Sequence, residues 1–399
     1  MTAGTNDDIF PYLLAFILNT LFLINYALWA VMPPSQASAL FMMGALTLTC
    51  LVMLGKKQLW PIFFFWIFLL LITLQTGTPA WDTRSIWMFH AKRIFFDATL
   101  YAALDGYSPW SHNAYPLLYP ALAASFAKAV GLWNEVFPKS VISFLYIPPA
   151  LILYKELRSS LGIAIFLLAA VLICGKLMYN GYADVIIAMY AAAIVLFSAN
   201  LSLDNTRGGA IRFALLLTSL TVLALIKNEG IVLAIAIIAT MCFLRREYWK
   251  IYLSTLTCAA LFLFFTWKLP LMFAQVSTDL AQGNILGRII ERISRSEEAL
   301  SILFAMFKNG ALLPILLTGA VLFFRASRRE YCVAICFVGL YSAALFAVYL
   351  STPHQLDLHL LYSIDRTMLP INIVCLATLL KLLLDELERR SQGGSAATP

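Results

Sequence analysis

The sequence contains little charge. Asp, Glu, Lys and Arg together make up 12% of its 399 residues, whereas apolar residues make up 61%. A water-soluble domain normally carries about twice that share of charged residues. Uncharged stretches of roughly 20 residues, the length that crosses a bilayer as a helix, recur along the chain. The composition therefore argues against the soluble classes and predicts an all-α polytopic membrane protein.

Cysteine pairs, metal-ligand motifs and internal repeats are also absent from the sequence. The seven cysteines all lie inside or at the ends of apolar stretches: Cys50, Cys174, Cys242, Cys258, Cys332, Cys336 and Cys375. Cysteines in such places usually pack as small apolar side chains. The sequence thus predicts neither a disulfide framework nor a zinc site. The first apolar stretch reaches Val31, too long for a signal-peptide core, and predicts a retained first span.

Twelve apolar segments are predicted to span the membrane. They lie near 9–31, 37–54, 59–75, 138–154, 161–178, 183–201, 211–226, 230–244, 251–268, 305–324, 331–350 and 367–384. Several are shorter than the roughly 20 residues that a perpendicular span needs. Together they predict one transmembrane domain over 1–384, followed by a disordered cytoplasmic tail over 385–399.

The orientation follows from the short connections that carry Lys and Arg. All of them fall on one side of the membrane if both termini are cytoplasmic, which is the side that basic loops favour. This placement explains the formal net charge of +7 without a nucleic-acid partner. It also predicts one long exterior loop over 76–137. Within that loop, residues 115–132 are expected to form a helix in or near the outer interface, because a further crossing would reverse every later basic loop.

With this topology, the unusual polar residues gather in four exterior places. These are the segment around Asp82, the turn 176–184, the turn 227–230 and the loop 351–366. All four histidines lie there too: His90, His112, His354 and His359. A charge at the bilayer centre costs about 2.5–3.5 kcal/mol even on a lenient scale, so such residues usually face water, a partner or a substrate. The pattern predicts an outward-facing polar site.

Each of these residues also has a purely structural interpretation. The aromatic and basic residues at 81–93 fit an interfacial belt. Asp184 fits the N-cap of a following helix. Lys227 and Glu229 fit a pair that neutralises itself at a helix end, and Arg366 with Asp365 fits a weak surface ion pair. The functional interpretation depends on the prediction that all four polar segments lie on the same side of the membrane.

Taken in order, these segments resemble the GT-C superfamily of integral-membrane glycosyltransferases, especially bacterial members related to glycosyltransferase family 39. The resemblance is carried by Trp81-Asp82 with Trp87 and Ala91-Lys92, Tyr115-Pro116-Leu117-Leu118 with Pro120, Gly181-Tyr182-Ala183-Asp184, Lys227-Asn228-Glu229-Gly230, and His359 with Ser363, Asp365-Arg366 and Pro370. The three spans predicted before the aspartate loop depart from the commonest layout of the family, in which fewer precede it.

The resemblance implies that a sugar moves from a polyprenyl-phosphate donor, of the undecaprenyl-phosphate type, to a glycan, lipid or protein acceptor on the exterior, periplasmic face. It also implies that the acid in the first exterior loop, here Asp82, is the catalytic base. Such a donor needs cations that stabilise the departing phosphate, and the candidates are Arg366, Lys227, Lys92 and Arg93. A single displacement with one base predicts inversion at the anomeric carbon.

Further substrate contacts are expected from Tyr115, Tyr182, Asp184, Glu229 and His359. A divalent cation, Mg²⁺ or Mn²⁺, is an open alternative for the phosphate, because carboxylate and imidazole groups are competent ligands. Its candidate ligands are Asp184, His354, Asp357 and His359. The expected location is the bacterial inner membrane.

Two other functions stay open at this point. A polysaccharide polymerase or ligase of the O-antigen type uses similar donors, but such proteins concentrate their catalytic residues in a large late loop, whereas the largest loop here is early. A transporter or flippase of lipid-linked sugars predicts inverted repeats and interrupted helices, for which the sequence gives no sign.

Overall fold

The computed structural model describes residues 9–78, 80–101, 107–202, 207–276, 284–323 and 328–395. These residues form helices and connecting turns without a β-strand. Within them, nine helical segments are long and apolar enough to cross a membrane. A pair of helices bent by 61°, Ser296–Gly310 and Leu312–Val321, adds a tenth if it counts as one span. The predicted all-α polytopic membrane architecture is confirmed, while the count of twelve spans stays a prediction.

The first half of the chain forms helices of very different lengths. They are α1 (Phe10–Val31), α2 (Gln36–Leu51), α3 (Trp60–Gln75), the π-helix η3 (Thr83–Trp87), α4 (Met88–Asp97), α5 (Leu118–Val130), η6 (Pro138–Val141), α6 (Ile142–Leu145), α7 (Ile147–Leu157), α8 (Ser160–Cys174), η7 (Gly175–Met178) and α9 (Asp184–Ala199). The short turns η1 (Val52–Gly55), η2 (Lys57–Leu59) and η5 (Pro109–Ser111) connect them.

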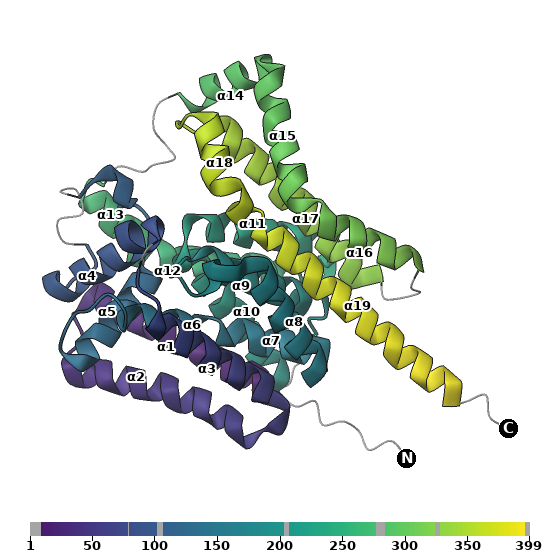
Figure 1. Ribbon diagram of the computed structural model, residues 1–399, viewed down its shortest axis with the longest axis horizontal. Coiled ribbons are helices and arrows are strands. Elements are labelled where there is room, and N and C mark those ends of the chain that lie inside the picture. Colours follow the sequence, from purple (N-terminus) through teal and green to yellow (C-terminus); the bar gives the residue numbers. More distant parts are fainter. Residues whose placement is uncertain are drawn as a thin grey trace.

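The second half contains the longest helices. They are α10 (Arg207–Ile226), α11 (Asn228–Leu244), η8 (Arg246–Tyr248), α12 (Trp249–Leu263), the π-helix η9 (Phe264–Lys268), α13 (Leu269–Phe273), α14 (Ile285–Ser294), α15 (Ser296–Gly310), α16 (Leu312–Phe323), α17 (Arg328–Ser351), α18 (Leu356–Thr367) and α19 (Leu369–Ser395). Figure 1 shows that α14, α15 and α18 project together from one end of the helix assembly.

The core is centred on α9. All 16 residues of this helix are buried, and it packs against α7, α10, α11, α17 and α19. In Figure 1 it lies in the middle of the molecule, between the purple N-terminal helices and the yellow α19. A helix of this length rises about 24 Å, less than the roughly 30 Å of a bilayer core. Both α9 and the 17-residue α11 fall short of a full span, although the sequence predicts spans at 183–201 and 230–244.

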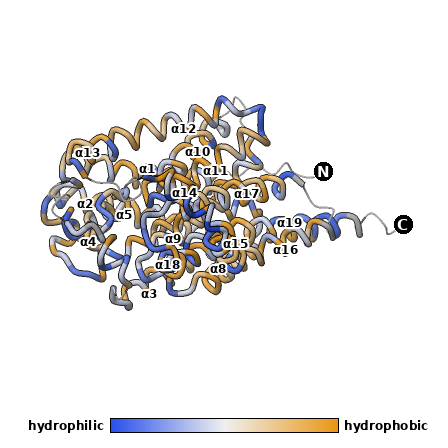
Figure 2. The backbone as a smooth tube through the Cα atoms, turned by 90° about the horizontal axis from the view of Figure 1, so that it is seen from above, coloured by the Kyte–Doolittle hydropathy of each residue, from blue (hydrophilic) through white to orange (hydrophobic). Residues whose placement is uncertain are grey.

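The outer helices expose apolar side chains, as lipid-facing helices do. On α8, Leu161, Leu168 and Leu172 are 68%, 62% and 77% exposed and follow one another at helical spacing along one face. Figure 2 shows hydrophobic colour along most of the helices and hydrophilic colour mainly at helix ends and connections. Such extensive exposed apolar surface is rare on soluble proteins.

The segment between α3 and η6 is packed against the helix assembly. Nearly every side chain of α5 is buried, and α5 packs against α1, α2 and α4. Its predicted position at the outer interface stays a prediction. The start of η6 is fixed by Lys139, whose side-chain ammonium donates to the backbone oxygens of Thr76 and Gly77 at 2.6 and 2.5 Å. A lysine in this position satisfies carbonyl groups left free at the end of α3.

The C-terminal residues differ from the prediction. Residues 385–395, expected to be a disordered tail, instead continue α19. Charged pairs at helical spacing stabilise this extension: Lys381 lies 2.5 Å from Asp385, and Arg390 lies 2.7 Å from Glu386. Opposite charges four residues apart support a helix by a few tenths of a kcal/mol per pair. The last four residues, 396–399, lie outside the described part of the chain.

Buried His90 holds α4 against the following turn. Its imidazole is 1% exposed, and Nε2 lies 2.9 Å from the carbonyl oxygen of Ser111. Burial lowers the pKa of His90 to about 4, although the hydrogen bond to Ser111 partly opposes this shift. The imidazole is therefore neutral at pH 7, with Nε2 as the donor.

We expect α4 to lose stability between pH 6.5 and pH 4. In that range His90 is protonated in the unfolded segment but stays neutral in the folded one. The free energy of unfolding therefore decreases by about 3 kcal/mol as the pH is lowered from 6.5 to 4. Hydrogen exchange of residues 88–97 should rise on acidification in the wild type but much less in His90→Gln, whose amide can still donate to Ser111. Equal pH responses of the two proteins would contradict this role of His90.

Candidate functional site

Asp82 lies at a break in regular helix geometry. It directly precedes the π-helix η3, which continues into α4, and its side chain is 16% exposed. Single π-helical turns are rare and are found frequently at functional sites. The break therefore lies directly beside the residue that the sequence predicts to be catalytic.

A close contact clamps η3 to the turn before α9. The hydroxyl of Thr83 donates to the carbonyl oxygen of Asn180 at 2.5 Å. The next residue, Gly181, has φ +92°, and a Cβ atom there would come within 2.4 Å of the Thr83 methyl group. Only glycine adopts this backbone conformation at little cost and leaves room for Thr83. This contact brings Asp82 and Asp184 to the same place.

Asp184 and Lys227 form a buried ion pair. Asp184 is the first residue of α9 and Lys227 directly precedes α11; their side chains are 2% and 7% exposed. The Lys227 ammonium lies 2.7 Å from Asp184 and 2.9 Å from Glu229. Acids in the first turn of a helix suit the positive end of its dipole, and they hold Lys227 between them.

Arg366 joins this pair to Asp82. One guanidinium nitrogen of Arg366 donates to the carboxylate of Asp82 and lies 3.7 Å from Asp184. The guanidinium is 5.2 Å from the ring centroid of Tyr182 and also donates to the backbone oxygen of Tyr362 at 2.9 Å. These contacts hold it in one orientation, as stacking and forked hydrogen bonds commonly do for arginine.

Five charged residues therefore form one connected group, which we call the charge cluster: Asp82, Asp184, Lys227, Glu229 and Arg366. Three carboxylates face two cations, so the formal charge is −1. Burying such groups is costly unless each is paired. Oxygens of two members, Asp184 Oδ2 and Glu229 Oε2, are buried without a hydrogen bond. A cluster that leaves acceptor atoms unsatisfied is a candidate for ligand binding.

Two predicted phosphate ligands pair elsewhere. Lys92 lies 3.8 Å from Glu135, and both side chains are nearly half exposed. Arg93 is held by Asp97 at 2.8 Å and by the Tyr107 hydroxyl at 2.7 Å. Both cations are thus engaged within the segment 76–137, apart from the ion pairs of the charge cluster.

The remaining predicted residues lie on several elements. Tyr115 stacks on His112 with ring centroids 4.7 Å apart. His359 lies 5.1 Å from the ring of Tyr349 and 5.5 Å from that of His354, and its buried Nδ1 has no hydrogen-bond partner.

The metal candidates do not form a metal-binding group. In the part of the chain that the structure describes, no three His, Cys, Asp or Glu side chains are arranged to hold a metal ion, and this includes Asp184, His354, Asp357 and His359. The charge cluster satisfies its carboxylates mainly with Lys227 and Arg366 instead.

Sequence reasoning missed the residues that position the charge cluster. Thr83 and Asn180 clamp η3 to the turn before α9, and only the glycine next to Asn180 signals this contact. Gly230 was noted in the sequence, but its packing was not: a Cβ atom there would lie 2.0 Å from the backbone oxygen of Leu223. This close approach allows the tight turn from α10 to α11 that places Lys227.

Comparison with known proteins gives no assignment: no protein-family model, curated protein or solved structure matches the chain.

We expect Gly181→Ala to destabilise the protein by about 1–3 kcal/mol, because alanine is strained at positive φ and its methyl group meets Thr83. The apparent melting temperature in detergent would report this. Adding Thr83→Ser removes the clashing methyl group and should recover part of the loss. Gly44→Ala, in a helix with open space around it, is the control and should have little effect. Equal melting temperatures for the two alanine variants would contradict the clamp.

Lys227→Met should be strongly destabilising, by about 3–5 kcal/mol, because it leaves the carboxylate of Asp184 buried without its cation. Adding Asp184→Asn should restore part of this loss, and the double-mutant cycle measures the coupling. The same substitution at exposed Lys92 is the control, with an expected cost under about 1 kcal/mol. Additive effects of the two substitutions would show that the pair is not coupled.

Proposed function

We propose that this chain is a membrane glycosyltransferase that moves a sugar from a polyprenyl-phosphate donor to an acceptor hydroxyl on the exterior face of the bacterial inner membrane. The observation that carries the proposal is the contact between Asp82 and Arg366. These residues are 284 positions apart in the sequence, and they supply the base and the phosphate-binding cation that this chemistry requires.

The depth of the charge cluster supports a lipid-linked substrate. The cluster surrounds the N-terminal ends of α9 and α11, which have 16 and 17 residues. At 1.5 Å per residue these helices rise about 24–26 Å, less than the roughly 30 Å of the bilayer core. Helices that stop short of the bilayer core leave room at their ends for a substrate that is anchored in the membrane.

The ion pair between Asp82 and Arg366 suggests how binding of the donor frees Asp82 to act as the base. In the resting state the Asp82 carboxylate is held by the arginine. The phosphodiester of the donor offers Arg366 two oxygens for its planar fork. When the phosphate takes that position, Asp82 is released to accept a proton. Lys227 remains paired with Asp184 and Glu229 and contributes a second positive charge to the site.

The transfer then needs one displacement. The acceptor oxygen bonds to the anomeric carbon while its proton passes to Asp82. The bond between that carbon and the phosphate oxygen breaks, and its electron pair stays on the polyprenyl phosphate, where Arg366 stabilises the charge. Because the attack comes from the face opposite the leaving phosphate, the product is inverted at the anomeric carbon.

A transporter of lipid-linked sugars is the second candidate, because one helix is interrupted beside the C-terminal end of α18. The bend of 61° between α15 and α16 lies at Gly310, where a Cβ atom would meet Met368, two residues after Arg366. Interrupted helices are typical of transporter binding sites. This function would predict movement of the intact lipid without cleavage of the bond between sugar and phosphate.

We expect Asp82→Asn to lower sugar transfer by about 10²-fold or more, because the amide cannot accept the proton. The assay supplies purified protein in liposomes with a panel of polyprenyl-phosphate sugars and a panel of hydroxyl-bearing glycan, lipid and protein acceptors, and measures release of polyprenyl phosphate. Asp97→Asn is the control, since Asp97 is a carboxylate of the same segment paired with Arg93. Normal turnover in Asp82→Asn would remove Asp82 as the base. Movement of intact donor across the bilayer without phosphate release would favour the transporter.

A further inference from the structure

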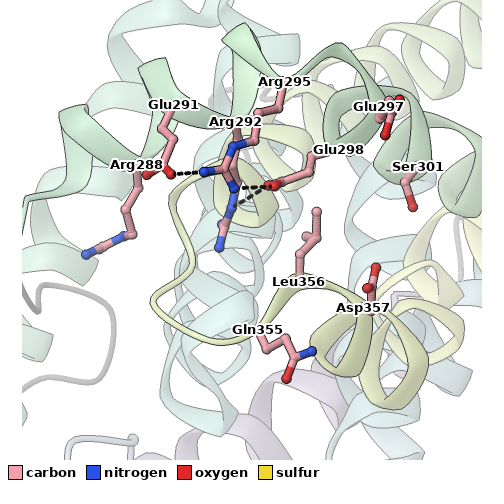
Figure 3. Close-up of a pocket in the computed structure, with 10 residues that line it drawn as sticks. All are labelled: Arg288, Glu291, Arg292, Arg295, Glu297, Glu298, Ser301, Gln355, Leu356 and Asp357. Carbon is pink, nitrogen blue, oxygen red and sulfur yellow. Dashed lines mark hydrogen bonds and ion pairs between the residues drawn. The ribbon is translucent and has the colours of Figure 1, made fainter.

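A second polar site lies at the far end of α18 from Arg366. A pocket of about 490 Å³ opens between α14, α15 and the turn from α17 into α18 (Figure 3). All but one of its lining residues are polar or charged: Arg288, Glu291, Arg292, Arg295, Glu297, Glu298, Ser301, Gln355, Leu356 and Asp357. None of these residues belongs to the charge cluster.

Arginines of α14 fix one wall of the pocket. Arg292 donates to the backbone oxygens of Tyr349 and Leu350 at 2.7 and 3.1 Å, and Arg288 donates to that of Ser351 at 2.8 Å. These carbonyl groups end α17, where basic side chains interact favourably with the helix dipole. The wall is therefore held in place before any ligand binds.

The opposite wall offers groups with no partner within the described chain. The side chains of Glu297, Ser301, Gln355 and Asp357 line the pocket without a hydrogen bond or ion pair to other described residues, and Figure 3 shows no contact drawn to them. Carboxylates, an amide and a hydroxyl together accept and donate hydrogen bonds. Three arginines face four acids across the whole lining, so the pocket does not select a polyanion. An uncharged ligand rich in hydroxyl groups fits this balance.

The outer face of α14 indicates that the ligand is attached to a lipid. Leu286, Ile290 and Ile293 are 72%, 68% and 57% exposed and lie away from the arginines that face the pocket. A short helix with one apolar and one charged face commonly lies in the membrane interface. The pocket on its polar side then sits at the level of lipid headgroups.

A row of polar residues connects the pocket to the charge cluster. His359, Tyr362 and Arg366 follow at spacings of three and four, which places them on one face of α18, and Gln355 precedes the first residue of this helix. The buried Nδ1 of His359, midway along this row, lacks a hydrogen-bond partner. From Gln355 to Arg366 the helix rises about 16 Å, further than one sugar ring spans.

We infer that this pocket binds the hydroxyl-rich head of a lipid-linked glycan, which extends along α18 so that its end reaches Asp82 as the acceptor of the transfer. The role as acceptor rests on the proposed function, whereas binding of the glycan head does not.

The test measures lipid binding rather than catalysis. Full-length protein in phosphatidylcholine nanodiscs is given dioleoylglycerol lipids with no sugar, one glucose, one galactose or two glucoses, together with phosphatidylglycerol of the same chains, and retention is measured by native mass spectrometry. The test variant is Glu297→Ala/Asp357→Ala, which breaks no described contact. The control is Glu135→Ala/Glu388→Ala, which removes one partly exposed and one exposed carboxylate outside this pocket.

We expect a glycosylated lipid, most strongly the two-glucose lipid, to be retained at least tenfold better than the sugar-free one, with the preference lost in the test variant and kept in the control. The inference is overturned if the headgroups are not distinguished, if phosphatidylglycerol is preferred, or if the test variant binds like the wild type. Asp82→Asn should keep the glycan preference. If the wild type binds the glycan lipid but transfers no sugar, the proposed function is contradicted. The assignment of this pocket as a glycan-binding site would still stand.

Discussion

The buried ion pair between Lys227 and Asp184 is the interaction on which the arrangement of the charge cluster depends. Its two side chains come from the ends of α9 and α11, and both helices stop short of a full membrane span. A charge in this environment is tolerated only with an opposite charge beside it. The pair therefore fixes the relative height of the two helices and gives Arg366 a second carboxylate to approach.

This dependence links parts of the chain that are far apart in sequence. The residue before η3 supplies Asp82, and the first residue of α9 supplies Asp184. The start of α11 supplies Lys227 and Glu229, and α18 supplies Arg366. Asp82, Asp184 and Arg366 each find an opposite charge only on another element, whereas Lys227 pairs both with Glu229 of its own element and with Asp184. Folding of the charge cluster is for this reason coupled to the packing of the whole assembly around α9, and a local defect in any one element exposes the others.

Much of the fold could be predicted from the sequence, because apolar periodicity and length decide where helices form in a membrane protein. The four polar places also stood out against the apolar background, and their members at 82, 184, 227, 229 and 366 meet in the structure.

What escaped prediction depends on local pairing and on packing. Arg93 lies four residues before Asp97 and pairs with it. The sequence shows this spacing, but Arg93 also fitted the predicted role of a phosphate ligand. The helical tail rests on similar pairs around Glu386. The pocket beside α14 arises only when its arginines meet the carbonyl groups that end α17. Sequence spacing carries no signal for that encounter.

The direction of the Asp82 carboxylate depends on the number of residues in the π-helical turn that follows it. An α-helix turns by about 100° per residue, so the one extra residue in a π-turn rotates everything before it by that amount relative to α4. The buried face of α4 is set by Met88, Ala91 and Ile94. Without the additional residue, the same packing of α4 would direct Asp82 away from Arg366. The angular phase of the helix, rather than any side chain within it, decides whether the Asp82 carboxylate faces Arg366.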